Sequence, residues 1–193
     1  MKVCVYGGNG YVGAKIVERL ARQGLQVLAI SRRGQCPAHL EKHQETKIWM
    51  KNVTWTIGDV SKPSSDHLEG SAAVITTVGS PPLPTFNQTA FELQVFMNGG
   101  ANAALIEACR HGPHRVVLCS AHIPSLLQTR KFGYYVGKTL AIIKATEFYN
   151  NHVKTDPTTS VGILKPSGTR FLFLRFAGNI FLSISWFVWV FCV

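Results

Sequence analysis

The stretch that decides the fold spans residues 2–24, KVCVYGGNGYVGAKIVERLARQG. Its first five residues form a mostly apolar run that ends in two glycines, the pattern of a buried strand entering a turn. The residues after the turn place Val12, Ile16 and Leu20 on one face of a helix, and Gly24 follows as a stop signal. The stretch therefore predicts a strand, a glycine turn and a helix in direct succession.

The turn itself, GGNGYVG at residues 7–13, has the glycine spacing of a dinucleotide-binding loop. Glycines at positions 7, 10 and 13 allow a tight turn, a close approach of the backbone to a pyrophosphate, and tight packing of the helix on the strand. The N-terminus of the helix directs its free N–H groups at the phosphates. A glycine triplet alone is weak evidence, but one that ends a strand and opens a helix predicts a bound dinucleotide.

The rest of the chain continues the alternation of short apolar strands and helices. Further strands are expected at 26–32, 53–60, 72–79, 115–121 and 160–166, and long helices at 91–111 and 132–150. Strands separated by helices predict an α/β fold of the Rossmann type, a doubly wound parallel sheet of about six strands over residues 1–170. In such sheets, ligands bind beyond the C-terminal ends of the strands.

The ends of the second and third strands bear on the choice of cofactor. Ser31-Arg32-Arg33 stands where an NAD-binding protein would have a carboxylate for the ribose, so the sequence favours NADP over NAD. The alternative is that an arginine stacks on adenine or lies in solvent. Asp59 is placed for the adenine amino group, or it caps the helix that follows. We expect cofactor contacts from Gly7, Asn9, Gly10, Tyr11, Val12, Gly13, Ser31, Arg32, Asp59, Val60, Val78, Gly79 and Lys138.

A proton-transfer pair is suggested by KFGYYVGKTLA at residues 131–141. Tyr134 and Lys138 lie four residues apart, so they share one face of the predicted helix. The cation is expected to favour phenolate and lower the pKa of Tyr134, which suits carbonyl reduction or alcohol oxidation. Ser120, at the end of the fifth strand, would hydrogen-bond the substrate oxygen. The alternative is a buried aromatic residue beside a surface lysine.

Composition argues against nucleic-acid binding and metal binding as functions of this chain. The formal charge is +10, but the basic residues are scattered in ones and twos, so we expect no nucleic-acid partner. The five cysteines have no spacing suited to zinc, so no metal site is predicted. The sequence instead predicts a reducing compartment, in which the cysteines stay as free thiols. The first strand begins within a few residues of Met1, so no targeting peptide is visible.

The C-terminal segment, residues 171–193, is strongly hydrophobic. Its last eighteen residues, 176–193, carry no charge, which reaches the lower limit for crossing a bilayer. Two interpretations stay open, a membrane anchor and a replaced C-terminus from an alternative or misassigned exon.

The motifs GGNGYVG, SRRG, GDV, FMNGGANAALIEACRHG, VVLCSA, YYVGK and ILKPSG together resemble the atypical or extended short-chain dehydrogenase/reductases over residues 2–170. They are most similar to the mitochondrial branch of coenzyme Q biosynthesis oxidoreductase-like proteins and their plant relatives. The nucleotide-binding accessory subunit of respiratory complex I is more distantly similar. The resemblance implies a Rossmann sheet, cofactor contacts from residues 7–13, and Tyr134 and Lys138 in the Y-x-x-x-K positions of the family.

The resemblance also implies a mitochondrial setting and a role near quinone synthesis or respiratory assembly, and a quinone-like or other hydrophobic small molecule is a candidate partner. Extended members have a substrate-binding lobe where this sequence has residues 171–193, so we expect that lobe to be absent or replaced. Two functions follow. The first is an NADP-preferring oxidoreductase or isomerase-type enzyme with Ser120, Tyr134 and Lys138 as its catalytic residues. The second is a catalytically silent nucleotide-binding subunit with a structural or assembly role.

Overall fold

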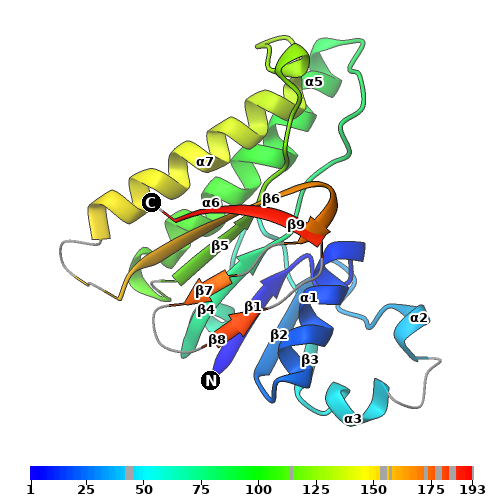
Figure 1. Ribbon diagram of the computed structural model, residues 1–193, viewed down its shortest axis with the longest axis vertical. Helices are drawn as coiled ribbons and strands as arrows, with labels where there is room; N and C mark the ends of the chain where they lie inside the picture. Colours follow the sequence, from blue (N-terminus) through cyan, green and yellow to red (C-terminus); the bar gives the residue numbers. More distant parts are fainter. Residues whose placement is uncertain are drawn as a thin grey trace.

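A computed structural model of the chain describes residues 1–41, 46–113, 115–152, 156, 158–171, 174–176, 180–182 and 186–192. Its central feature is a seven-stranded sheet in the order β3-β2-β1-β4-β5-β6-β9 (Figure 1). The strands are β1 (Lys2–Tyr6), β2 (Gln26–Ser31), β3 (Val53–Ile57), β4 (Ser71–Thr76), β5 (Arg115–Cys119), β6 (Ser160–Phe171) and β9 (Trp186–Cys192). The first six are parallel. This arrangement confirms the predicted Rossmann-type fold.

Helices cover both faces of the sheet. On one face lie α1 (Tyr11–Arg22), α2 (Ala38–Glu41) and α3 (Thr46–Met50); on the other lie α4 (Ser65–Leu68), α5 (Gln88–Val95), the π-helix η1 (Phe96–Gly100), α6 (Ala101–Ala108) and α7 (Gly133–His152) (Figure 1). Strand β1 shows why both faces need cover. Val3 and Val5 pack on the α1 side, whereas Cys4 and Tyr6 pack on the α6 and α7 side.

Several elements differ from the sequence prediction. The third strand ends at Ile57 rather than at residue 60, because residues 59–62 close a turn with a hydrogen bond from Lys62 N to Asp59 O. The helix expected at 91–111 begins at Gln88, where the Asn87 side chain accepts from Ala90 N, and it contains the π-helix η1 in its middle. The short helices α2, α3 and α4 were not expected, since each is only four or five residues long.

The C-terminal segment contributes a strand to the sheet. Strand β9 pairs antiparallel with β6, with Gly162 opposite Cys192 and Lys165 opposite Trp189. Strands β7 (Leu174–Phe176) and β8 (Ile180–Leu182) form a separate antiparallel pair. Parts of the predicted hydrophobic segment, residues 172–173, 177–179, 183–185 and 193, lie outside the described residues. Among the residues that are described, no helix combines the length and apolarity needed to cross a membrane.

The strand order places a crevice at one edge of the sheet. Strand β1 is paired with β2 on one side and with β4 on the other. Successive strands are therefore added first on one side of β1 and then on the other, which makes β1 the switch point of the sheet. Ligands of open α/β sheets bind at this switch point, outside the C-terminal ends of the strands. The glycine turn follows β1 at that point, and residues 77–79 follow β4.

Candidate functional site

The glycine turn brings α1 very close to β1. Gly7 has a φ of 82°, at which a residue with a side chain would be strained. Its backbone N–H donates to Ile30 O at 2.8 Å. A Cβ on Gly13 would lie 2.1 Å from Gly7 O, so only glycine allows this approach. The turn therefore depends on the spacing that the sequence predicted.

The first turn of α1 is available to an anion. Its N-cap residue is Gly10, which makes no side-chain cap, and the first turn has no acidic residue. The helical hydrogen bonds begin with Ala14 N to Gly10 O at 2.8 Å. The backbone N–H groups of Tyr11, Val12 and Gly13 therefore have no partner within the helix, and the helix dipole favours a negative charge beside them.

A groove of about 270 Å³ runs from this turn across the C-terminal ends of β1, β2 and β4. Most of the predicted cofactor residues line it, namely Gly7, Asn9, Gly10, Ser31, Arg32, Asp59, Val60, Val78 and Gly79. The predicted residues Tyr11, Val12, Gly13 and Lys138 do not line it. The groove is also lined by residues outside the predicted set, namely Tyr6, Ile30, Gly58, Ser61, Thr77, Phe96, Met97 and Ala101. Phe96, Met97 and Ala101 escaped prediction because they come from a helix packed beside the groove rather than from a strand end.

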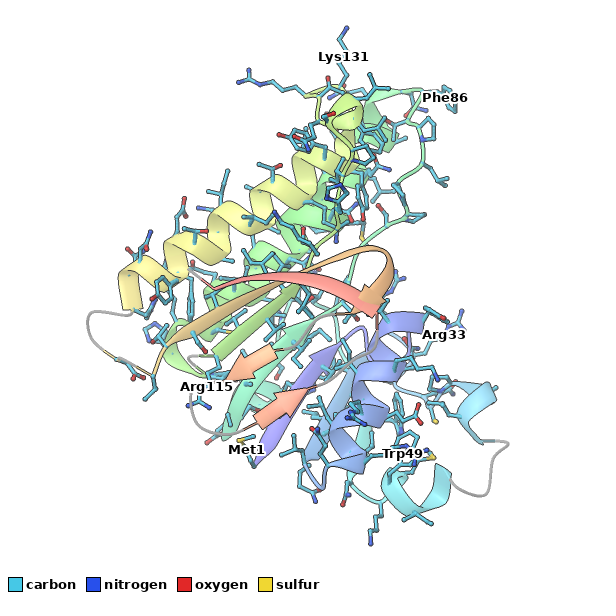
Figure 2. The ribbon with its side chains drawn as sticks, in the orientation of Figure 1. Met1, Arg33, Trp49, Phe86, Arg115 and Lys131 are labelled. Atoms are coloured by element: carbon cyan, nitrogen blue, oxygen red, sulfur yellow. The ribbon has the colours of Figure 1, made fainter. Side chains whose placement is uncertain are left out.

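The end of β2 presents a guanidinium to the groove. Ser31 is buried, and its Oγ accepts from Gly34 N at 3.1 Å, which turns the chain sharply away from the strand. Gly34 has a φ of 62° at this turn. Arg32 lines the groove, whereas Arg33 is exposed outside it (Figure 2). No carboxylate follows β2 at this position.

Asp59 stabilises a turn rather than a helix. Its Oδ1 accepts from Ser61 N and from Ser61 Oγ, both at 2.8 Å. These hydrogen bonds, with a smaller contribution from the charge of Arg32, hold the pKa of Asp59 below its usual range. The helix that follows, α4, has its own cap in Ser64. The predicted helix cap is therefore wrong, and the carboxylate faces the groove as an anion.

Lys138 reaches from α7 toward the groove through the protein interior. It is 6% exposed, its Nζ donates to Cys119 O at 3.2 Å, and burial lowers its pKa. The same Nζ lies 3.2 Å from the position of a Cβ on Gly79, which lines the groove, and 5.6 Å from the ring centre of Tyr134. Lys138 thus connects the groove, the end of β5 and the predicted acid/base residue.

The expected lowering of the tyrosine pKa is wrong. Burial raises the pKa of Tyr134, and the thiol of Cys119 raises it further. Lys138 was expected to stabilise the phenolate, but its Nζ lies over the ring, 5.6 Å from the ring centre. Burial is the larger cause of the raised pKa, so Tyr134 is a neutral phenol at neutral pH.

Two buried oxygen atoms of this region, one after β5 and one in η1, have no hydrogen-bond partner among the described residues. One is Ser120 Oγ, on a residue that is 4% exposed, and the other is Asn98 Oδ1, on a fully buried residue. Asn98 Oδ1 lies 2.7 Å from the position of a Cβ on Gly79. Asn98 was missed by the sequence analysis, although a polar residue before two glycines in the apolar run FMNGGANAALI was a usable signal. Unpaired buried oxygens are costly, so these two are suited to a bound molecule.

These features define a nucleotide-binding Rossmann protein. The uncapped turn of α1 suits a diphosphate, and the Ser31 and Asp59 region suits an adenosine. The groove includes Gly79, beside which Lys138 Nζ and the unpaired Asn98 Oδ1 lie. Residues 7–177 match the family described as NAD(P)H-binding, and the chain belongs to this family. Its cofactor is therefore NAD(P).

Two curated proteins are similar to the chain. One, named MIOREX complex component 2, from Saccharomyces cerevisiae, is 38% identical over 80 residues, which cover 40% of this chain and 28% of that protein. The other, from Arabidopsis thaliana, is named as an uncharacterized chloroplastic protein and is 30% identical over 170 residues, covering 86% of this chain and 49% of that protein. The chain thus spans about half or less of the length of these relatives.

Solved structures share the fold at low identity. A carbonyl reductase from Pseudomonas aeruginosa PAO1 gives a TM-score of 0.67 at 16% identity, covering 86% of this chain and 83% of that one. UDP-glucuronic acid 4-epimerase from Bacillus cereus, in complex with NAD, gives a TM-score of 0.60 at 20% identity, covering 78% of this chain and 52% of that one. The chain therefore shares the Rossmann-type fold of these proteins.

Proposed function

We propose that the chain is an NAD(P)H-dependent oxidoreductase that prefers NADPH and reduces a hydrophobic carbonyl compound. The observation that carries this proposal is the position of the buried Lys138 Nζ. It lies beside Gly79 of the cofactor groove, over the Tyr134 ring, and at the end of the strand that carries Ser120. A merely structural lysine would keep its ammonium in water, because burial of an ammonium costs free energy.

Each of the three polar residues has a role that its surroundings support. Bound NADPH supplies a hydride. Tyr134 donates the proton to the substrate oxygen, and its raised pKa keeps that proton in place at neutral pH. Ser120 Oγ, which has no partner among the described residues, donates a hydrogen bond to the same oxygen. Lys138 has two N–H donors beyond the one used on Cys119 O, and these are available to orient ligand hydroxyls.

The loops that follow β4 and β5 carry exposed apolar side chains, which support an apolar substrate. The loop after β4 exposes Leu83 and Phe86, which are 61% and 94% exposed, and the loop after β5 exposes Leu126 and Leu127, which are 89% and 43% exposed. Both loops leave the C-terminal edge of the sheet, and Phe86 points outward there (Figure 2). Apolar side chains near a site bind apolar surface by the hydrophobic effect. A quinone-like substrate fits this chemistry and the role near quinone synthesis that the resemblance implies.

The preference for NADPH is proposed from Arg32. Arg32 lines the groove at the end of β2, which supports binding of a 2′-phosphate by its guanidinium, and no carboxylate directly follows the strand to bind a free 2′-hydroxyl.

The experiment that tests the function uses the whole chain. Oxidation of NADPH is followed with a panel of quinones and aldehydes, for the wild type, Tyr134→Phe and the matched control Tyr135→Phe. We expect turnover in the wild type and the control, and a loss of at least about 100-fold in Tyr134→Phe, as for a general acid. Equal rates in wild type and Tyr134→Phe would contradict the assigned role.

A second candidate function is a nucleotide-binding subunit that does not turn over. The similarity to a protein whose name makes it a component of a complex favours it. Binding of NADPH with no oxidation across the panel is the outcome that supports this candidate, since a cofactor that binds only the folded state stabilises it.

The proposed setting is an organelle. The resemblance implies a mitochondrion, and the plant relative is named as chloroplastic. Fractionation of cells that express the tagged chain tests this setting, and enrichment in the cytosolic fraction alone contradicts it.

A further inference from the structure

Three buried amide side chains, Gln94, Asn98 and Asn102, form a row along α5, η1 and α6. They are spaced four residues apart and are 5%, 0% and 0% exposed. Each bonds to the chain that leaves β4. Asn102 Nδ2 donates to Val78 O at 3.1 Å, and Asn98 Nδ2 donates to Ser80 Oγ at 2.7 Å. The row therefore holds the loop after β4 against the helix, residue by residue.

Gln94 holds the part of the loop that lies farthest from β4. Its Nε2 donates to Pro81 O at 3.1 Å and to Leu83 O at 2.9 Å. The loop, SPPLPTFN at residues 80–87, contains three prolines, which have no N–H to donate. Within residues 79–86, all of which the structure describes, the backbone makes one hydrogen bond to itself, from Leu83 N to Pro81 O. The Gln94 amide thus supplies two bonds where the backbone of the loop supplies one.

The other end of the Gln94 amide faces α7. Its Oε1 is buried with no hydrogen-bond partner in the described part of the chain. It lies 3.0 Å from the position of a Cβ on Gly133. Gly133 is the first residue of α7, and Tyr134 is the second. The amide therefore lies between the loop after β4 and the helix end that carries the proposed proton donor.

We propose that Gln94 is a positioning residue of the active site. Its amide sets the spacing between the loop at 79–87 and the first turn of α7, and so the position of Tyr134 relative to the wall formed by Gly79. Gln94 itself is not among the residues that line the groove. The consequence for catalysis rests on the proposed function, whereas the contact with the loop does not.

The test compares two variants of α5. Gln94→Met keeps the length of the side chain but removes both donors, and Gln88→Met removes an exposed amide that bonds only to Glu92 Oε1. Hydrogen–deuterium exchange is measured in residues 79–87, in the first turn of α7, and in β1 as the reference for global stability. We expect loop amides to exchange at least about tenfold faster in Gln94→Met, with β1 unchanged, and no change in Gln88→Met.

A second measurement separates this inference from the proposed function. In the wild type, NADPH is expected to slow exchange at residues 7–13 and in the first turn of α7. In Gln94→Met, the protection at 7–13 remains and the protection at α7 is lost. If NADPH protects neither region in the wild type, the proposed function fails, and the comparison without cofactor still tests the loop contact. Loop exchange within about twofold of wild type in Gln94→Met, or full protection of α7, overturns the inference.

Discussion

Tyr134 keeps its proton through neutral pH because burial raises its pKa above the ordinary value of 10.0. For a general acid, the protonated form is the active one, so activity is lost only as the pH rises through the raised pKa. We expect kcat/KM for reduction to be constant from about pH 7 to about pH 10 and then to fall. In the direction of alcohol oxidation, the phenolate is needed, so the rate rises with pH. A fall that begins below the ordinary pKa of tyrosine and does not follow the lowered pKa of Lys138 would contradict this assignment.

Arg32 and Arg33 are adjacent and differ in one respect, since only Arg32 lines the groove. Arg32→Ala removes the charge proposed to bind a 2′-phosphate. We expect its Kd for NADPH to rise about 10- to 100-fold, the size of a lost charge-assisted hydrogen bond, with the Kd for NADH almost unchanged. Arg33→Ala is the matched control and is expected to leave both values near wild type. Isothermal titration with the two cofactors measures this, and equal losses for both would remove the case for NADPH.

Single residues also show where prediction from sequence ends. The identity of Tyr134 and Lys138 as a pair was readable, because helical spacing is a local property. The direction in which the pKa of Tyr134 is shifted could not be predicted. It depends on burial and on Cys119, which lies on a strand fifteen residues earlier in the chain. Asn98 and Gln94 were missed for the same reason, since their partners lie in the loop after β4.

At the scale of elements, the contact between α1 and β1 depends on Gly13. A Cβ there would overlap Gly7 O, a backbone atom that cannot move without disturbing the turn. We expect Gly13→Ala to lower the free energy of unfolding by about 1–3 kcal/mol and to abolish cofactor binding. Gly112→Ala is the control, since a Cβ there would meet Leu68 Cβ at an ordinary 3.7 Å. Urea unfolding and NADPH titration measure both effects, and binding at wild-type affinity in Gly13→Ala would show that the turn adapts.

The pairing of β9 with β6 gives the hydrophobic C-terminal segment a role in the sheet. Deletion of residues 186–193 is expected to expose the edge of β6 and lower the urea midpoint of unfolding, because an unpaired edge loses its hydrogen bonds and invites association. The alternative is a membrane anchor, which stays a prediction. An unchanged midpoint after the deletion, together with resistance of the full chain to carbonate extraction from membranes, favours the anchor.

At the scale of the whole molecule, the doubly wound parallel sheet and a ligand site at the C-terminal ends of its strands followed from sequence, because strands alternate with helices and a glycine turn follows the first strand. The strand order and the antiparallel β9 were not predicted. The π-helix η1 did not follow, since the run FELQVFMNGGANAALIEA has no proline, and its two adjacent glycines weaken a helix without specifying how its hydrogen bonding changes. The row of amides was not readable either, because it exists only when the loop after β4 lies along that helix.

Cofactor binding is expected to stabilise the entire fold. At 100 times its Kd, a ligand that binds only the folded state contributes about 2.7 kcal/mol, which raises the Tm of a chain of this size by roughly 5–10 °C. The chain carries a formal charge of +10, and NADPH is an anion, so the shift is expected to shrink as salt is added. A thermal melt at low and high ionic strength measures both trends. No shift with either NADPH or NADH would contradict binding by this chain under those conditions.

The π-helix η1 is a place where homologues can differ in length by one residue. A π turn holds one more residue than the α turn it replaces, so it marks a site where a single codon can be gained or lost without ending the helix. Loss of one residue within Phe96–Gly100 would rotate α5 by about 100° relative to α6 and shift it by about 1.5 Å. Gln94 would then leave the proline loop while Asn102 kept its place. A homologue that aligns here with a one-residue gap is therefore expected to hold its loop by other means and to accept a different range of substrates.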